Sequence, residues 1–259
     1  MTLLDRLAEI GEEGGRAVLL TVVVGDRPGA KLLVEEGGAT HGDGPPELAE
    51  QADALIRGGR NALLELGERR VLAEVYAPPP RVLIYGAVDT AEYIAQAVKL
   101  VGWTSIVADA RRPYLTRERL PTPDELVVGW PDAVFEQVKP DHATAIVVLT
   151  HDAKFDGPAI DGALRSEAFY IGALGSRRRQ DKLRERLEGL GFDAEAIGRI
   201  KGPCGLDIGA DTQPETAVSI VAEMLAVRSG RAGGPLAQTR ARIHVADSEH
   251  RLAASPPAA

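Results

Sequence analysis

The sequence is poor in the features that would place a protein outside the cell or in a membrane. Its 259 residues include a single cysteine, Cys204, which excludes an intramolecular disulfide and indicates a reducing compartment. No apolar run approaches the roughly 18 residues of a membrane span, and residues 1–13 form an amphipathic, partly acidic pattern rather than a signal peptide. We therefore expect a soluble cytoplasmic protein.

Positive charge is also scarce. Lys and Arg total 30 against 38 Asp and Glu, which gives a formal net charge of −8. This balance disfavours wholesale binding to nucleic acid or to an anionic membrane surface. With 44% hydrophobic residues, the chain is long enough for one large domain or two small ones with a sizeable core.

Residues 1–77 predict a small α+β domain. Apolar runs flank the turn signal 25–29 and indicate a hairpin, and a stiff polyproline spacer, Pro78–Pro80, follows the domain. The predicted elements are a helix over 3–10, strands over 17–24 and 31–34, a helix over 47–57, and strands over 62–66 and 70–76.

Residues 81–230 predict a doubly wound, mostly parallel Rossmann-like α/β domain. A β-branched run ends at Gly86, a helical pattern follows, and a strand over 104–108 ends in Asp109. Asp109 lies 23 positions after Gly86, close to the expected offset of an acidic ribose ligand. Further strands are predicted over 125–128, 143–149 and 168–174, and further helices over 157–164, 177–190 and 212–228; residues 231–259 are predicted to be a flexible tail.

The turn after Gly86 departs from the dinucleotide-binding fingerprint. Val88 stands where a second glycine would let the backbone approach a pyrophosphate, and the Asp89 carboxylate would compete with a phosphate for the helix N-terminus. Asp89 with Glu92 is typical of a helix N-cap and its capping box. We interpret this turn as a feature of the fold rather than as a standard NAD site.

In open parallel sheets, ligands bind outside the carboxyl ends of the strands. This rule selects the neighbourhoods of Gly86, Asp109, Thr150 and Gly172. The turn over 172–177 offers two glycines, a hydroxyl and helix N-terminal amides, and segment 177–186 holds six basic residues against two acidic ones. The pattern favours binding of a phosphate or similar anion, and the alternative is an ordinary Ser176 cap on a solvated basic helix.

Segment 150–156 combines an imidazole with two carboxylates and therefore permits acid–base chemistry or metal binding. The alternative is that Asp152 caps the next helix while His151 bonds to a loop. With no second histidine nearby, a polar ligand contact is favoured over a metal. Cys204 lies in a glycine-rich loop without a visible activating base, so we interpret it as lining a pocket without reacting.

Several motifs, taken together and in this order, resemble the XdhC/CoxI family of accessory proteins for molybdenum hydroxylases such as xanthine dehydrogenase and carbon monoxide dehydrogenase. The residues that carry the resemblance are Tyr85–Val88, Val107–Arg111, Val148–Asp152 with Phe155 and Asp156, Tyr170–Arg177, Gly202–Gly209 and Pro214–Glu223. More weakly, Thr21–Val23 and Pro28–Val34 resemble the N-terminal domain of that family.

The resemblance implies a chaperone that binds molybdenum cofactor, as molybdopterin or a dinucleotide form, favours its sulfurated form and delivers it to a hydroxylase apoenzyme. It also implies a homodimer, and a cysteine desulfurase is a candidate partner. The cofactor-binding residues implied are Gly86, Asp109, Arg111, Thr150, His151, Asp152, Asp156, Gly172, Gly175, Ser176, Arg177, Cys204 and Asp207.

One segment departs from the family pattern. Longer members carry Gly-Gly-Cys-x-Glu in the N-terminal domain, whereas the corresponding loop here, Gly37–Gly44, has no cysteine. A sulfur- or molybdenum-ligating role for this domain is therefore not implied. Two other functions stay open from the residues alone: an NAD(P)-dependent oxidoreductase using Gly86 and Asp109, and a hydrolase using His151, Asp152 and Asp156.

Overall fold

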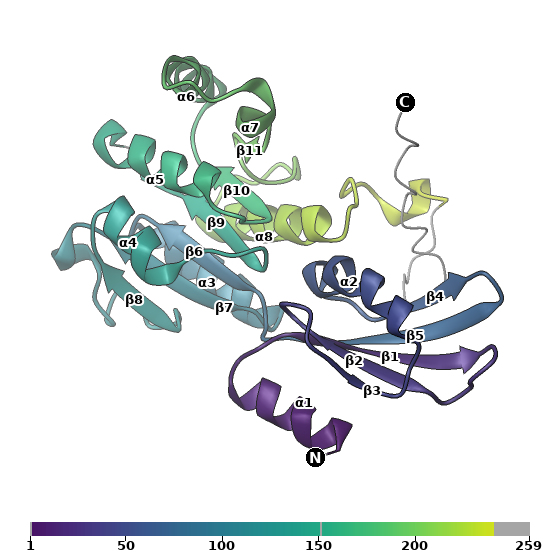
Figure 1. The fold of residues 1–259 in the computed structure, drawn as a ribbon. Helices are drawn as coiled ribbons and strands as arrows, with labels where there is room; N and C mark the ends of the chain where they lie inside the picture. Colours follow the sequence, from purple (N-terminus) through teal and green to yellow (C-terminus); the bar gives the residue numbers. More distant parts are fainter. Residues whose placement is uncertain (1, 151, 241–259) are drawn as a thin grey trace. The chain divides into compact units, whose positions relative to one another are not determined.

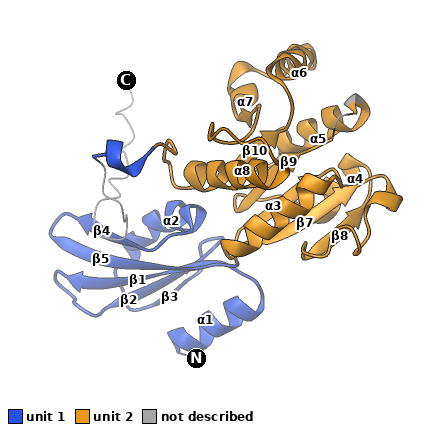
Figure 2. Cartoon of the chain, turned by 180° about the vertical axis from the view of Figure 1, so that it is seen from behind, with its two compact units in different colours: residues 1–78, 235–259 blue, residues 79–234 orange. Residues whose placement is uncertain are grey.

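The computed structural model describes residues 2–150 and 152–240, and the chain divides into two compact units (Figure 2). Unit 1 comprises Met1–Pro78 and Pro235–Ala259, and unit 2 comprises Pro79–Gly234. Each unit has a sheet and a hydrophobic core of its own.

Unit 1 is built on an antiparallel sheet with the strand order β3-β2-β1-β5-β4. Its strands are β1 (Ala17–Val24), β2 (Lys31–Glu35), β3 (Thr40–Gly42), β4 (Ala62–Leu66) and β5 (Arg69–Tyr76). One face is covered by η1 (Pro46–Gln51) and α2 (Ala52–Gly58), and part of the other by α1 (Leu3–Glu12) (Figure 1).

Both faces of β1 are apolar because helices cover the sheet from both sides. Val18 and Leu20 pack with α2, whereas Leu19 packs with α1, as the two-residue period of a strand requires. The strands predicted in this part of the chain are confirmed, although β3 was missed. The helix predicted over 47–57 is a 3-10 turn, η1, followed by α2.

Unit 2 is built on a six-stranded parallel sheet with the order β11-β10-β9-β6-β7-β8. Its strands are β6 (Arg81–Tyr85), β7 (Thr104–Asp109), β8 (Glu125–Val128), β9 (Thr144–Val148), β10 (Tyr170–Ala173) and β11 (Ile200–Lys201). This is the doubly wound order, in which the chain reverses direction across the sheet between β6 and β9. The predicted fold class is therefore confirmed.

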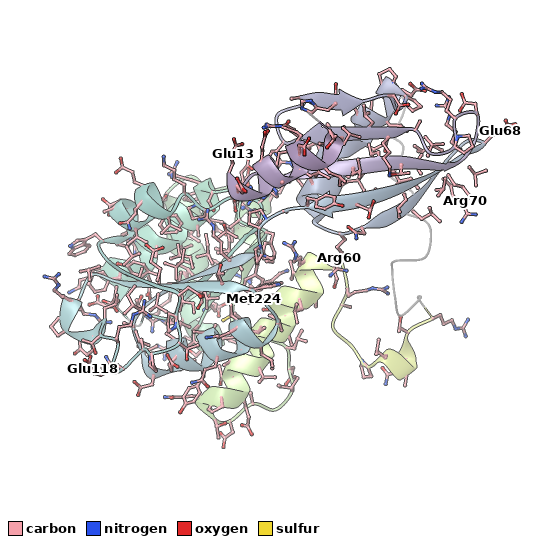
Figure 3. All side chains as sticks on the ribbon, turned by 90° about the horizontal axis from the view of Figure 1, so that it is seen from below. Glu13, Arg60, Glu68, Arg70, Glu118 and Met224 are labelled. Carbon is pink, nitrogen blue, oxygen red and sulfur yellow. The ribbon has the colours of Figure 1, made fainter. Side chains whose placement is uncertain are left out.

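Helices cover both faces of this sheet (Figure 1). On one face, α8 (Gln213–Arg228) packs against α3 (Asp89–Leu100), and Met224 of α8, labelled in Figure 3, is fully buried there. The other face carries α4 (Pro131–Val138), α5 (Ala153–Arg165), α6 (Arg177–Gly189) and α7 (Ala194–Gly198). Short 3-10 turns are η2 (Arg112–Tyr114) and η3 (Leu236–Gln238).

Three predictions at helix ends need correction or extension. The N-cap of α3 is Val88 and no side chain caps the helix, so the predicted Asp89 cap with its box is wrong. Helix α5 begins at Ala153, earlier than predicted, because Asp152 caps it. Helix α4 was missed, and its Pro131 stands in the first turn, where no backbone N–H is needed.

No helix within the described ranges is both long enough and apolar enough to cross a membrane. Most of the predicted tail, residues 241–259, lies outside the described residues, as do Met1 and His151.

Unit 1 contains a compact ionic cluster that joins α1, β2 and β3. The Arg6 guanidinium donates to both carboxylate oxygens of Glu35 at 2.7 Å, and His41 Nε2 lies 2.6 Å from Glu35 Oε1. The hydrogen bonds from Arg6, with a smaller contribution from His41, lower the pKa of Glu35 to about 2. The folded state therefore holds this carboxylate ionised at pH values where the unfolded chain takes up a proton.

We expect Glu35 to contribute stability above about pH 4.5, its ordinary pKa, and to lose that contribution as the pH falls toward 2. Denaturant unfolding followed by circular dichroism from pH 6 to pH 2.5 should therefore show a smaller acid-induced loss of stability in Glu35→Gln than in the wild type. Glu68→Gln, at the exposed turn between β4 and β5 (Figure 3), is the matched control. Parallel pH profiles for the wild type and Glu35→Gln would contradict the assignment.

Candidate functional site

Asp109 ends β7, and only 1% of its surface is exposed. Its Oδ2 accepts from the Ala87 N–H at 2.8 Å, and its Oδ1 accepts from the Arg111 N–H at 2.8 Å. The Arg111 guanidinium adds a two-point ion pair, with Nε 2.9 Å from Oδ1 and Nη2 2.8 Å from Oδ2. Burial by itself would raise the pKa of Asp109, but the hydrogen bonds from Arg111 and Ala87 outweigh it and keep the pKa below its usual value. Asp109 is thus a charged anchor whose two oxygens are engaged by protein donors.

The turn after β6 uses its backbone donors inside the protein. Gly86 N–H donates to the Ala108 carbonyl at 2.8 Å, and Val88 N–H donates to the Gly86 carbonyl at 3.0 Å. The intervening Ala87 N–H is held by Asp109. A pyrophosphate site needs such N–H groups to be free. The turn is therefore closed to that type of ligand.

Gly86 follows β6 and lies beside Thr150 at the end of β9, where the strand order reverses. Its φ is +121°, a backbone conformation that residues other than glycine rarely adopt. A Cβ here would lie 3.0 Å from both the N and the Cγ2 of Thr150. Position 86 therefore needs glycine for two independent reasons.

Thr150 continues the contacts from β9 toward α5 and α6. Its hydroxyl donates to Asp156 Oδ1, and Arg179 Nη2 lies 2.5 Å from Asp156 Oδ2. A cavity of about 30 Å³ lies beside this group, lined in part by Val148, Ala173, Leu174 and the three polar side chains. The volume is sufficient for an ordered water molecule, which needs roughly 10–15 Å³.

The turn before α6 differs from the turn after β6 in charge, because α6 has no acidic residue in its first turn whereas α3 has two. Ser176 is the N-cap of α6, as predicted, but its side chain makes no capping hydrogen bond. Arg177 and Arg178 follow in the first turn and are exposed. Helix N-terminal amides and two guanidinium groups at one place favour an anionic ligand.

A partly buried polar cluster lies beside β10. The Tyr170 hydroxyl donates to Glu223 Oε2 at 2.6 Å, and the Gly205 N–H donates to the same oxygen at 2.8 Å. Gly172 makes room for this cluster, since a Cβ there would lie 2.9 Å from Tyr170 Oη and 3.1 Å from Cys204 Cβ. Burial, with the Glu223 carboxylate as a smaller cause, raises the pKa of the Cys204 thiol to about 12. The thiol is therefore neutral at physiological pH.

Five of the thirteen predicted site residues form one series of contacts along the carboxyl edge of the sheet: Asp109, Arg111, Gly86, Thr150 and Asp156. The series runs from Asp109 through the turn at Gly86 to Thr150, and from there to Asp156 and α6. The Ala173 carbonyl accepts from Gln180 Nε2 and from the Cys204 N–H, both at 3.2 Å, which joins the Cys204 loop to α6.

Other predicted residues have different surroundings. Asp152 caps α5 by accepting from the Lys154 N–H at 3.1 Å, as the alternative interpretation of segment 150–156 predicted. Asp207 is exposed, and His151 lies outside the described residues. Within the described ranges, no three His, Cys, Asp or Glu side chains come together as a group that could hold a metal ion.

Sequence reasoning gave no role to Arg179, Arg119 or Glu223. Arg179 was one of six basic residues in its segment, and only its place in the first turn of α6 sets it apart. Arg119 reaches across 30 positions to Asp89 at 2.8 Å, a pairing without a local signal. Glu223 did carry a signal: it is a charged residue directly before Met224, which belongs to the buried face of α8.

Comparison with protein families gives a match over more than half of the chain. The profile described as the XdhC Rossmann domain matches residues 82–224, which extend from β6 into α8.

Three curated proteins resemble parts of the chain. YqeB of Escherichia coli K12 is 31% identical over 65% of this chain and 31% of its own length. A protein of Bacillus subtilis, named as a probable xanthine dehydrogenase subunit, is 32% identical over 58% of this chain and 44% of its own length. The molybdenum cofactor insertion chaperone PaoD of E. coli K12 is 28% identical over 59% and 42%. The chain thus spans less than half the length of each of these relatives.

Among solved structures, a xanthine dehydrogenase from Bacillus halodurans is similar, with a TM-score of 0.66 and 21% identity. The match covers 86% of this chain and 65% of that one. At this level of identity the likeness concerns the fold.

We expect the purified protein not to bind NADH or NADPH with sub-micromolar affinity. The N–H groups of the turn after β6 are already bonded, and Asp109 already accepts four hydrogen bonds from Ala87 and Arg111. Isothermal titration calorimetry with both dinucleotides checks this. A sub-micromolar dissociation constant for either would restore the dehydrogenase interpretation.

We expect Cys204 to resist thiol reagents in the folded protein. A pKa near 12 instead of the ordinary 9.0 leaves about a thousandfold less thiolate at pH 8. Reaction with iodoacetamide, followed by mass spectrometry, should be at least a hundredfold slower than for the same protein unfolded in urea. Equal rates in the two states would show that the thiol is accessible and ionised.

Proposed function

The chain belongs to the XdhC family, and on that premise we propose that it is an accessory protein that binds molybdenum cofactor and assists its sulfuration and its insertion into a molybdenum hydroxylase. The relatives named for xanthine dehydrogenase and for molybdenum cofactor insertion support this role. The cofactor is cargo here: the protein binds it and passes it on. Hydroxylases of the xanthine dehydrogenase or carbon monoxide dehydrogenase type are the proposed recipients.

The open N-terminus of α6 is the observation that carries the proposal. Molybdopterin and its dinucleotide forms carry phosphate, and Ser176 leaves the first amides of α6 without a side-chain cap. Arg177 and Arg178 add two positive charges at the same turn. The N–H groups of the turn after β6 are bonded within the protein, and α3, although also uncapped, carries the acidic Asp89 and Glu92 in its first turn where α6 carries arginines.

The raised pKa of Cys204 supports a scheme in which another protein carries the sulfur. A nucleophilic sulfur carrier must reach its thiolate form, and burial opposes that form at Cys204. We propose that a separate enzyme, such as a cysteine desulfurase, supplies the sulfur. This protein would then hold the cofactor during the step, with Cys204 part of the packing behind the site.

We also propose that the protein forms a homodimer through unit 1. On the α1 side of its sheet, Leu72 and Tyr76 of β5 are exposed although they are large and apolar. Arg70 and Glu74 flank Leu72 two residues away on the same face of β5. A twofold axis at Leu72 would bring Arg70 of one copy against Glu74 of the other, the self-complementarity that an isologous interface requires.

Replacing Arg177 and Arg178 together with alanine should weaken binding of molybdenum cofactor at least tenfold, about 1.4 kcal/mol, while the circular dichroism spectrum is unchanged. The measurement is an anaerobic binding titration with cofactor released from a molybdoenzyme. Lys182→Ala with Arg184→Ala removes the same charge from exposed positions further along α6 and is the matched control. Equal losses in the two double variants would reduce the effect to net charge, and a wild-type protein that does not bind the cofactor would refute the proposed function.

A further inference from the structure

A row of cationic and aromatic side chains crosses the carboxyl edge of the unit 2 sheet. The guanidinium carbons of Arg119 and Arg111 lie 5.4 and 4.7 Å from the centre of the Tyr114 ring. Arg111 also lies 5.7 Å from the centre of the Phe155 ring, and the Trp130 ring follows at 5.0 Å with a tilt of 50°. We call these five side chains the ring row.

The members of the ring row come from loops and helix starts that follow β7, β8 and β9. This is the edge of a parallel sheet at which ligands bind. Except for Arg111, the row lies outside the set of residues that the family resemblance implied. It therefore raises a separate question about what binds there.

The row is held in place from beneath. The buried Asp109 fixes Arg111 through both carboxylate oxygens. Arg119 donates to Asp89 at 2.8 Å and to the Tyr114 carbonyl at 3.1 Å. A surface that is fixed before binding loses little conformational freedom when a ligand arrives.

The backbone at Trp130 is anchored as well, and the side chain is open to solvent. It is the N-cap of α4, and the Tyr85 hydroxyl donates to the carbonyl of the preceding Gly129 at 3.1 Å. Even so, 53% of Trp130 is exposed. The chain's other tryptophan, Trp103, is partly buried and packs edge-on against Phe169. An exposed indole that packs against another ring is suited to stacking with a flat ligand ring.

Three cations lie along the row, and each has a carboxylate partner: Arg111 pairs with Asp109, Arg119 with Asp89, and Lys154 with Asp152 at 3.3 Å. The Lys154 side chain is nevertheless 59% exposed and can contact a ligand as well. The Lys154 ammonium lies 4.7 Å from the centre of the Phe155 ring, which is the member of the row between Arg111 and Trp130. The Arg111 side chain is 38% exposed, so part of its guanidinium faces solvent although Asp109 holds it. Arginine and lysine beside an aromatic surface are the groups that recognise phosphate on a stacked ring.

We propose that the ring row binds a planar heteroaromatic ring that carries a phosphate, with the ring stacked on Trp130. Two ligands have this chemistry: the pterin of the cofactor, in which case the inference rests on the proposed function, and the base of a nucleotide. Either ligand would present a flat π-face to Trp130 and a negative charge to Arg111 and Lys154.

The full-length protein labelled with 5-fluorotryptophan tests this directly, because its two tryptophans give two fluorine resonances. Trp130→Phe assigns the resonances. Addition of cytidine monophosphate, guanosine monophosphate or neopterin monophosphate should shift the Trp130 resonance and leave that of Trp103 in place. Ribose 5-phosphate, which has the phosphate but no ring, should leave both resonances unmoved. The three ring probes distinguish a nucleobase from a pterin as the preferred ligand.

Affinity provides a second readout. Trp130→Ala should weaken binding of the preferred ring probe about tenfold, within the range of a lost base–aromatic stack. Trp130→Phe should recover most of the affinity, whereas Trp103→Phe should bind as the wild type does. A fluorine spectrum in which no ring probe moves the Trp130 resonance would overturn the inference, as would unchanged affinity in Trp130→Ala.

The test separates this inference from the proposed function. If the cofactor binds and depends on Arg177 and Arg178 but leaves Trp130 unmoved along with every ring probe, the ring row is not a ligand site and the proposed function stands. If nucleotides shift Trp130 while the cofactor does not bind, the ring row stands and the proposed function fails.

Discussion

The buried carboxylate of Asp109 is the interaction on which the carboxyl edge of unit 2 depends. It neutralises Arg111, satisfies the Ala87 N–H and so joins the ends of β6 and β7. Because the Arg111 side chain is 38% exposed, solvent would screen its charge, and loss of this partner should cost less than the roughly 3–5 kcal/mol typical of a fully buried pair. The position of the Arg111 guanidinium, and with it the order of the rings around it, follows from this one side chain.

The groups available to a ligand therefore lie at other places on this sheet than in dinucleotide-binding proteins. In dinucleotide-binding proteins the first turn and the acidic end of the second strand hold the ligand. Here the same two places bind each other through Asp109 and Ala87, while the turn at Ser176 keeps uncapped amides and exposed arginines. The ligand sites proposed for this edge accordingly lie at the start of α6 and at Trp130, not at the first turn.

The sequence predicted most of the fold because strand and helix patterns are local. The run 144–148 could only be a strand covered on both faces, and Asp109 could be placed at the end of its strand. The partners of these residues could not be predicted. Arg119 meets Asp89 across 30 positions, and Arg179 meets Asp156 across 23, distances at which the chain gives no periodic signal. The roles of Trp130 and Glu223 depend in the same way on packing between elements.

The hydrogen bond between the Ala87 N–H and Asp109 also determines which substitutions these positions tolerate. The donor is a backbone N–H, so the bond itself demands nothing of side chain 87 except that it not be proline, which has no N–H. Asp109 has no such freedom, because it must supply two oxygens and a charge. Gly86 is fixed for a third reason, steric crowding by Thr150. Three residues that lie close together at this edge of the sheet are thus open, chemically fixed or sterically fixed, and substitutions in descendants of this chain should accumulate unevenly among them.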